Sequence, residues 1–253
     1  MARVFEKLAE WREERVRMER AGRVVGFVPT MGALHAGHRA LLERARAEND
    51  CVVLSVYVNP TQFDDPADLT KYPRAHAADL ALAEGLADCV LFPSTEELYP
   101  NDYRYRVTEH PMSTRWEGKH RPGHFEGMLT VVLKLLNLVR PNRAYFGEKD
   151  WQQLQLVRDM AQALFLPVEI VPCVTVRDPD GLALSSRNLR LSTSGRSQAT
   201  IFPQALRASP DAATAAHTLR AAGFAVDYVE DHDGVRMGAV RLEGVRLIDN
   251  VRL

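Results

Sequence analysis

The stretch that most constrains the fold is residues 24–38, where a short apolar run leads through a glycine-containing turn into a helix. Val24–Val28 is expected to form a buried strand, and the apolar spacing of a helix begins near Ala40. The turn ends in His35-Ala36-Gly37-His38, called the HxGH turn below. In an open α/β sheet, such a junction presents backbone N–H groups and the positive end of a helix dipole to a phosphate.

The two histidines of the HxGH turn lie three residues apart at a helix start. That spacing places them on one side of the helix, where both can donate to an anion. The alternative is a polar turn in which a histidine does no more than cap the helix.

A second buried strand is expected over Cys51–Val58, which is too continuously apolar for a half-exposed strand. The two strands and the helix between them make a βαβ unit with a right-handed crossover. Asn59 and Gln62 follow the carboxyl end of the second strand, where they would hydrogen-bond to a small polar substrate. The alternative is an Asn-Pro turn with Gln62 facing solvent.

The rest of the chain continues as α/β and then changes character after Leu191. Strands and helices alternate first, which favours an α/β structure with parallel strands; an Ala-rich helical stretch and three short strands follow, which is an α+β pattern. Helices are expected at 3–20, 75–86, 125–140, from 151 onward, and as two at 194–222; strands at 88–92, 103–108 (exposed), 143–146, 167–172, 224–229, 237–242 and 245–251.

Three polar segments are candidates for substrate binding. Residues 113–124 are expected to form a long basic loop, either a lid or an ordinary mobile loop. Lys149 follows a strand and a glycine at a helix start, which suits a phosphate; simple capping chemistry is the alternative. Ser185-Ser186-Arg187 follows a glycine turn and suits a phosphate clamp, or a serine pair that caps a turn.

Composition excludes several other classes of protein. The 253 residues carry a net charge of -1, so no basic excess points to nucleic acid as the partner. The three cysteines lie in apolar runs without metal-ligand spacing, and are expected to be buried reduced thiols. With no run long enough to span a membrane and no signal-peptide pattern, a cytoplasmic protein without membrane contact is expected.

Six motifs together resemble one family, the pantothenate synthetases (pantoate–β-alanine ligases). The resemblance is close over about residues 1–192 and returns at 226–230 and 246–250. The motifs, in order, are Val28-Pro-Thr-Met-Gly-Ala-Leu-His-Ala-Gly-His38, Tyr57-Val-Asn-Pro-Thr-Gln-Phe63, Tyr72-Pro-Arg74, Arg121-Pro-Gly-His-Phe125, Phe146-Gly-Glu-Lys-Asp-Trp-Gln-Gln153 and Gly181-Leu-Ala-Leu-Ser-Ser-Arg-Asn188.

The resemblance implies a fold and a reaction. The fold would be a Rossmann-like parallel sheet with helices on both faces, at residues 1–175, followed by a smaller α+β lid domain at 176–253. The reaction would join (R)-pantoate to β-alanine through a pantoyl adenylate, with release of AMP and pyrophosphate. ATP is the implied substrate, Mg²⁺ the implied cofactor and a homodimer the implied assembly.

The resemblance also implies roles for individual residues. His35, His38, Lys149 and Arg187 would be catalytic, and Asn59, Gln62, Tyr72 and Gln153 would bind pantoate or β-alanine. No protein ligand for the metal is implied, because Ala78 leaves the acidic cluster around Asp79 incomplete. The ATP-binding set would be Pro29, Thr30, Met31, Gly32, Ala33, Leu34, His35, Ala36, Gly37, His38, Gly147, Glu148, Lys149, Asp150, Val176, Leu184, Ser185, Ser186 and Arg187.

Two other functions share parts of this pattern. A nucleotidylyltransferase acting on a phosphorylated metabolite would keep the HxGH turn but need extra cations and have less use for Gln62 and Gln153. A non-catalytic RNA- or nucleotide-binding module would need a basic stripe. Two departures from the family bear on domain closure: residues 193–253 are expected to form a shortened domain, and Ile201-Phe-Pro203 to interrupt a helix.

Overall fold

A computed structural model describes residues 2–253. The chain folds into two compact units. The first unit runs to Gly147 and resumes over Gln152–Cys173, and the second comprises Glu148–Trp151 and Val174–Leu253. The short segment Glu148–Trp151 therefore packs with the second unit although both of its flanking elements belong to the first. The expected lid role and the boundary at residues 175/176 stay predictions.

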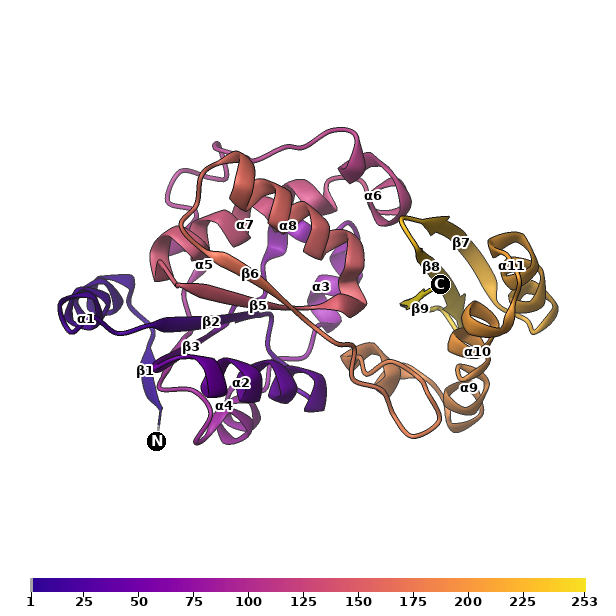
Figure 1. Ribbon diagram of the computed structural model, residues 1–253, viewed down its shortest axis with the longest axis horizontal. Helices are drawn as coiled ribbons and strands as arrows, with labels where there is room; N and C mark the ends of the chain where they lie inside the picture. The colour runs from indigo at the N-terminus through magenta and orange to yellow at the C-terminus, as the bar shows by residue number, and fades with distance from the viewer. Residues whose placement is uncertain (1) are drawn as a thin grey trace. The chain divides into compact units, whose positions relative to one another are not determined.

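The first unit is built on a six-stranded sheet in the order β1-β4-β3-β2-β5-β6, and every neighbouring pair is parallel (Figure 1). From β2 the chain moves outward through β3 and β4 on one side, then returns beside β2 as β5 and continues to β6. This is the Rossmann-like, doubly wound arrangement that the family resemblance implied. The strands are β1 (Arg3–Phe5), β2 (Val25–Thr30), β3 (Cys51–Val56), β4 (Cys89–Leu91), β5 (Arg143–Gly147) and β6 (Glu169–Cys173).

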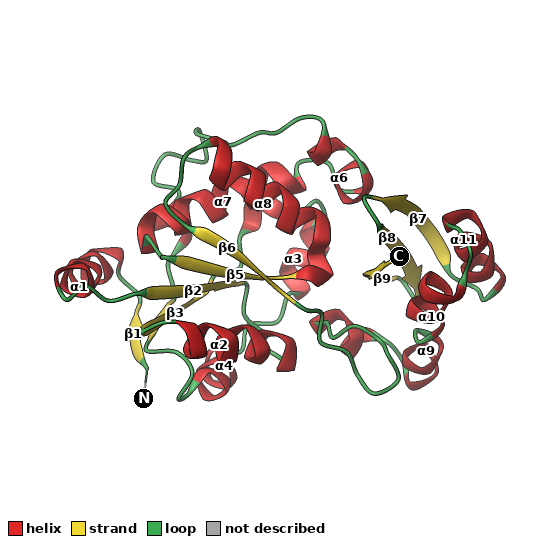
Figure 2. Ribbon diagram, viewed as in Figure 1, coloured by secondary structure: helices red, strands yellow, loops and turns green. Residues whose placement is uncertain are grey.

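Helices cover both faces of this sheet (Figure 2). Val53 packs into a core with helices α1, α7 and α8, whereas its neighbours Val52 and Leu54 pack into a second core with α2 and α4. Both faces of β3 are buried, which is why its sequence is continuously apolar. The helices are α1 (Leu8–Arg20), α2 (Ala36–Glu48), α3 (Pro66–Lys71), α4 (His76–Ala83), α5 (Thr95–Leu98), α6 (Trp116–His120), α7 (His124–Val139) and α8 (Trp151–Ala163).

Two local predictions were wrong. The helix expected over 3–20 begins only at Leu8, because Arg3–Phe5 pairs with β4 at the sheet edge. Residues 103–108 form no strand: Val107 donates its N–H to the Thr130 hydroxyl on α7 instead of to a neighbouring strand. Helix α1 also buries a cation: Arg15 is buried and donates to the carbonyls of Val139 and Arg140 at the end of α7.

The second unit is an α+β structure, as predicted. Its antiparallel sheet has the order β7-β8-β9, with helices α9, α10 and α11 and a core of its own. Three helices replace the two expected, because a break at residues 199–200 separates α9 from α10; Ile201-Phe-Pro203, expected to interrupt a helix, instead begins α10. The bounds are α9 (Thr193–Gln198), α10 (Ile201–Ala208), α11 (Ala212–Ala221), β7 (Ala225–His232), β8 (Val235–Leu242) and β9 (Val245–Arg252).

Two expectations drawn from composition concern the cysteines and membrane-spanning helices. Cys51, Cys89 and Cys173 are free and buried, which confirms the expected thiols. Among residues 2–253, no helix combines the length and apolar character needed to cross a membrane.

Candidate active site

The strand order places the topological switch point of the sheet between β2 and β5. The register pairs Phe27 with Ala144, and continuing it brings the strand ends Thr30 and Gly147 to the same edge. Ligands of open α/β sheets bind at this edge. Both strand–turn–helix junctions predicted from the sequence begin here.

The HxGH turn caps α2 through its own histidines. His35 is the N-cap residue, and its Nδ1 accepts the Gly37 N–H at 3.1 Å. The Nδ1 of His38 accepts the His35 N–H at 3.3 Å, and the two ring centroids lie 4.2 Å apart. A neutral imidazole that accepts at Nδ1 carries its proton at Nε2. In that tautomer each ring has an N–H donor at Nε2, so the capping and anion-binding interpretations are compatible.

A buried carboxylate shapes the turn that precedes the HxGH residues. Asp79 of α4 is 1% exposed. Its Oδ1 accepts the Leu34 N–H at 2.8 Å and its Oδ2 the Ala33 N–H at 3.3 Å. Ala33 and Gly32 both have positive φ, and a Cβ on Gly32 would lie 2.9 Å from Asp79 Oδ2. Asp79 thus fixes a backbone that most side chains disfavour. No local pattern in the chain signals this role, because the contact joins residues 45 and 46 positions apart.

We expect Asp79→Ala to lower the free energy of unfolding by about 2–4 kcal/mol, because two partly buried N–H groups lose their acceptor. Asp79→Asn keeps one carbonyl oxygen and should lose about half as much. Urea unfolding of the two variants and the parent measures both values. If the alanine variant is as stable as the asparagine variant, the Asp79 carboxylate does not hold both N–H groups.

Asn59 and Gln62 lie in one buried polar network at the carboxyl end of β3. They are 1% and 7% exposed, so the interpretation of Gln62 as a solvent-facing residue is wrong. Asn59 Nδ2 donates to Gln62 Oε1 at 3.0 Å and to the Gly127 carbonyl at 3.2 Å. Gln62 Nε2 lies 3.3 Å from Met31 Sδ, which brings the predicted pantoate-binding and ATP-binding turns together.

Helix α7 and its preceding turn pack directly on this network. The 59–62 turn fits because residue 127 is glycine: a Cβ there would lie 2.2 Å from the Thr61 carbonyl oxygen. His124 Nδ1 lies 2.8 Å from the Gln62 carbonyl oxygen, and Arg121 forms a 3.0 Å ion pair with Asp64. Two basic residues of the predicted loop are therefore bound in place beside Gln62. Tyr72 lies nearby, with its ring 5.6 Å from that of Phe63.

The basic segment 113–124 is not the unstructured loop that was expected. It contains α6, and Gln152 of α8 ties its first half down. Gln152 Oε1 accepts the Glu117 N–H at 3.0 Å, and Nε2 donates to the carbonyls of Met112 and Arg115 at 2.8 and 3.0 Å. Gln152 is 4% exposed, so its role is structural, and Gln153 remains the candidate for substrate binding.

The second unit carries the other predicted ATP-binding residues. Lys149 lies in a 3₁₀ turn over Glu148–Asp150. Ser185 Oγ accepts the Arg187 N–H at 3.3 Å and so caps the 3₁₀ turn Ser186–Arg190. Leu184 donates its N–H to the Val176 carbonyl at 3.0 Å. Ser185 is therefore a capping residue, as one of the two interpretations predicted. Its hydrogen bond orients the backbone of Ser186 and Arg187.

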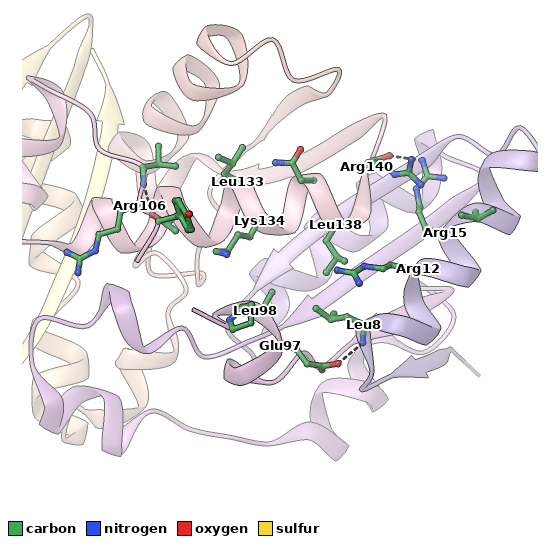
Figure 3. Close-up of a pocket in the computed structure, with 16 residues that line it drawn as sticks. Leu8, Arg12, Arg15, Glu97, Leu98, Arg106, Leu133, Lys134, Leu138 and Arg140 are labelled. Atoms are coloured by element: carbon green, nitrogen blue, oxygen red, sulfur yellow. Dashed lines mark hydrogen bonds between the residues drawn. The ribbon is translucent and has the colours of Figure 1, made fainter. Parts of the chain in front are cut away.

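A groove of about 730 Å³ elsewhere on the first unit contains none of the predicted site residues (Figure 3). It lies beside α1 and α7, and Figure 3 shows Arg15 reaching Arg140 at its edge. Burial, and next the charge of Arg140, lower the pKa of Arg15. Arg15 therefore has a structural role, because its guanidinium group caps the end of α7. We place the candidate active site at the switch point and not in this groove.

Known proteins resemble this chain over nearly its whole length. A family model described as pantoate-beta-alanine ligase matches residues 3–252. The chain belongs to this family. The pantothenate synthetase of Bdellovibrio bacteriovorus is 55% identical over 230 residues, 90% of this chain and 92% of the relative. That of Legionella pneumophila is 46% identical over 252 residues and 99% of each chain, so the expected shortening of residues 193–253 is not seen against it.

Solved structures of pantoate-beta-alanine ligases share the fold. The enzyme of Francisella tularensis, complexed with "Beta-gamma ATP" and β-alanine, has a TM-score of 0.95 at 36% identity and covers 100% of this chain and 98% of its own. The pantothenate synthetase of Thermus thermophilus has a TM-score of 0.90 at 43% identity, with 99% of each chain covered. The predicted Rossmann-like sheet and smaller α+β domain are confirmed.

Proposed function

We propose that this chain is an AMP-forming amide-bond ligase that condenses (R)-pantoate with β-alanine at the expense of ATP. The observation that carries the proposal is the family match over residues 3–252. The HxGH turn at the carboxyl end of β2 supports it, because this is the edge of the sheet where phosphates bind.

In the first half-reaction, a pantoate carboxylate oxygen attacks the α-phosphorus of ATP. The bond from that phosphorus to the bridging oxygen breaks, and pyrophosphate leaves with the bond's electron pair. Two anions must meet, so positioning and charge neutralisation supply most of the catalysis. In our proposal the Nε2–H groups of His35 and His38 donate to phosphate oxygens, and His38 serves the leaving pyrophosphate.

In the second half-reaction, the amine of β-alanine attacks the acyl carbon of pantoyl adenylate. The amide bond forms, the acyl–phosphate bond breaks, and AMP leaves while the nitrogen loses a proton. An acyl adenylate is readily hydrolysed, so it must be kept from water. Asn59 and Gln62 are buried polar groups that would contact the substrate away from bulk water.

The first unit supplies the residues proposed to bind pantoate or β-alanine and more than half of those for ATP. Gln62 and Gln153 would bind pantoate, with Asn59 and Tyr72 as further contacts. The second unit supplies Lys149 and the clamp Ser185-Ser186-Arg187. Among residues 2–253, no carboxylate forms an ion pair with Lys149, which leaves its charge for a phosphate.

Magnesium is included in the proposal only as a companion of ATP. Within residues 2–253, no three His, Cys, Asp or Glu side chains are grouped to hold a metal ion. Asp79 is the carboxylate that contacts the backbone just before the HxGH turn, and both of its oxygens already accept backbone N–H groups. The ion would be held by phosphate oxygens and water, as Mg²⁺ prefers, and no proposed step uses a protein-bound metal.

A homodimer and a cytoplasmic location complete the proposal. The three free, buried cysteines support a reducing compartment. Sedimentation of the purified protein would test the dimer.

The deciding experiment measures pyrophosphate release from ATP with pantoate alone, β-alanine alone and both. We expect a single-turnover burst with pantoate alone and multiple turnovers only with both. No release under any of these conditions would overturn the proposal and favour a nucleotidylyltransferase, for which phosphorylated acceptors would then be offered.

A further inference from the structure

The motif Arg246–Asn250 on β9 matches the family, but no part of the proposed reaction uses it. We infer that its last two residues, Asp249 and Asn250, are positioning residues that hold both phosphate-binding segments of the second unit to one strand. The inference rests on the proposed function, in which Lys149 and Ser185-Ser186-Arg187 bind ATP. All the contacts that carry it lie within the second unit.

Asn250 holds the turn that contains Lys149. Its Nδ2 donates to the carbonyl oxygens of Glu148 and Lys149, both at 2.9 Å. Arg252, two residues further along β9, donates to the Glu148 carboxylate at 2.9 Å. A primary amide can donate two hydrogen bonds from one uncharged nitrogen, which suits two adjacent carbonyls. These bonds fix the backbone on which the Lys149 side chain is mounted.

Asp249 holds the segment that leads to the Ser185-Ser186-Arg187 clamp. It is 3% exposed and binds Arg177 through two hydrogen bonds, Nη1–Oδ2 at 2.7 Å and Nη2–Oδ1 at 2.8 Å. Such a bidentate pair fixes direction as well as distance. Arg177 also donates to the Gly181 carbonyl at 3.0 Å and forms a β-bridge with Ala183. The turn before Ser185 is thereby closed and tied to β9.

The two anchors are adjacent on a strand that is itself fixed. Asp249 pairs with Gly238 and Asn250 with Met237 of β8, in the regular antiparallel register. Asn250 further donates its own N–H to Asp249 Oδ1 at 2.8 Å and accepts from Arg177 at its carbonyl, 3.1 Å away. The spacing between the Lys149 turn and the clamp is therefore set by neighbouring residues of one strand. Small displacements of phosphate-binding groups reduce catalysis strongly.

The test replaces Asn250 by aspartate, which keeps its shape but presents acceptors instead of donors to the two carbonyls. We expect kcat/KM for ATP to fall about 10–100-fold, while KM for pantoate stays within about twofold, because the Gln62 network belongs to the first unit. Asn250→Ser serves as a second, smaller variant should the aspartate fail to fold. The matched control is Asp227→Asn, which removes the Arg246 ion pair (2.8 Å) in the same sheet without contacting the Lys149 turn.

Calorimetric titration with ATP makes the result independent of turnover. Weaker ATP binding by the Asn250 variants than by the control supports the positioning role even if the parent protein shows no ligase activity, which would overturn the proposed function alone. Parent-like ATP kinetics and binding in a folded Asn250 variant would overturn the inference. The inference would also be overturned if kcat/KM fell equally for ATP and pantoate and the Asp227 control showed the same fall, because that result indicates general destabilisation.

Discussion

Replacing His38 by alanine is expected to slow pyrophosphate release by about 10²–10⁴-fold, the usual range for a lost proton donor or charge-stabilising group. The reason is the Nε2–H that His38 presents once its Nδ1 has accepted the His35 N–H. Rapid-quench measurement of the first turnover, with saturating pantoate and ATP, reports this step without product release.

The structure also gives His38 a capping role, which must be separated from the chemical one. Loss of a cap costs about 0.5–2 kcal/mol of stability. His38→Asn supplies a side-chain oxygen that can accept the His35 N–H but cannot act as an acid. We expect the asparagine variant to regain most of the stability and little of the rate. Near-normal first turnover in either variant would contradict the assigned role.

Replacing Gln62 by alanine is expected to lower kcat/KM for pantoate by about 100-fold, as for the loss of two hydrogen bonds to an anionic ligand. ATP should be affected much less. Asn59 retains its Gly127 and Tyr99 partners, so the surrounding network survives the change. Steady-state kinetics with each substrate varied in turn makes the comparison.

Gln62→Glu sharpens this prediction, because it keeps the shape of the side chain and exchanges the amide donor for a carboxylate. A residue that donates to the pantoate carboxylate should then lose more affinity than in the alanine variant, through repulsion between like charges. If both variants raise the requirements for ATP and pantoate equally, Gln62 does not bind pantoate. Thermal unfolding of both proteins excludes a loss of fold as the cause.

Much of the fold was predictable because its signals are local. The buried strand Cys51–Val56 was recognised from an unbroken apolar run, and the end of α7 from Pro141. The family motifs fixed the fold class and the switch-point junctions. The errors came where distant residues decide the structure: Arg3–Phe5 became a strand because β4 pairs with it, and residues 103–108 did not because Val107 found Thr130.

The roles of polar residues divided in the same way. The family resemblance identified Gln62 and Gln153 as substrate-binding candidates, whereas only the structure shows that the neighbouring Gln152 is bound to three backbone groups of residues 112–117. The histidines of the HxGH turn were proposed either to cap or to bind an anion. The hydrogen bonds at Nδ1 show that both rings cap the helix, and anion binding through Nε2 stays a proposal that is compatible with this capping.

The sequence by itself determined most of the elements that this chain forms, the family to which it belongs and the residues proposed to bind phosphate. Periodicity, glycine turns and ordered motifs are all written within short stretches of chain. The tertiary structure alone decided how those turns are held. Asp79 reaches the HxGH turn from α4, and Asp249 and Asn250 reach the other two segments from β9. The sequence around a carboxylate or amide does not indicate which distant group it will bind, because burial and hydrogen bonding are properties of the folded chain.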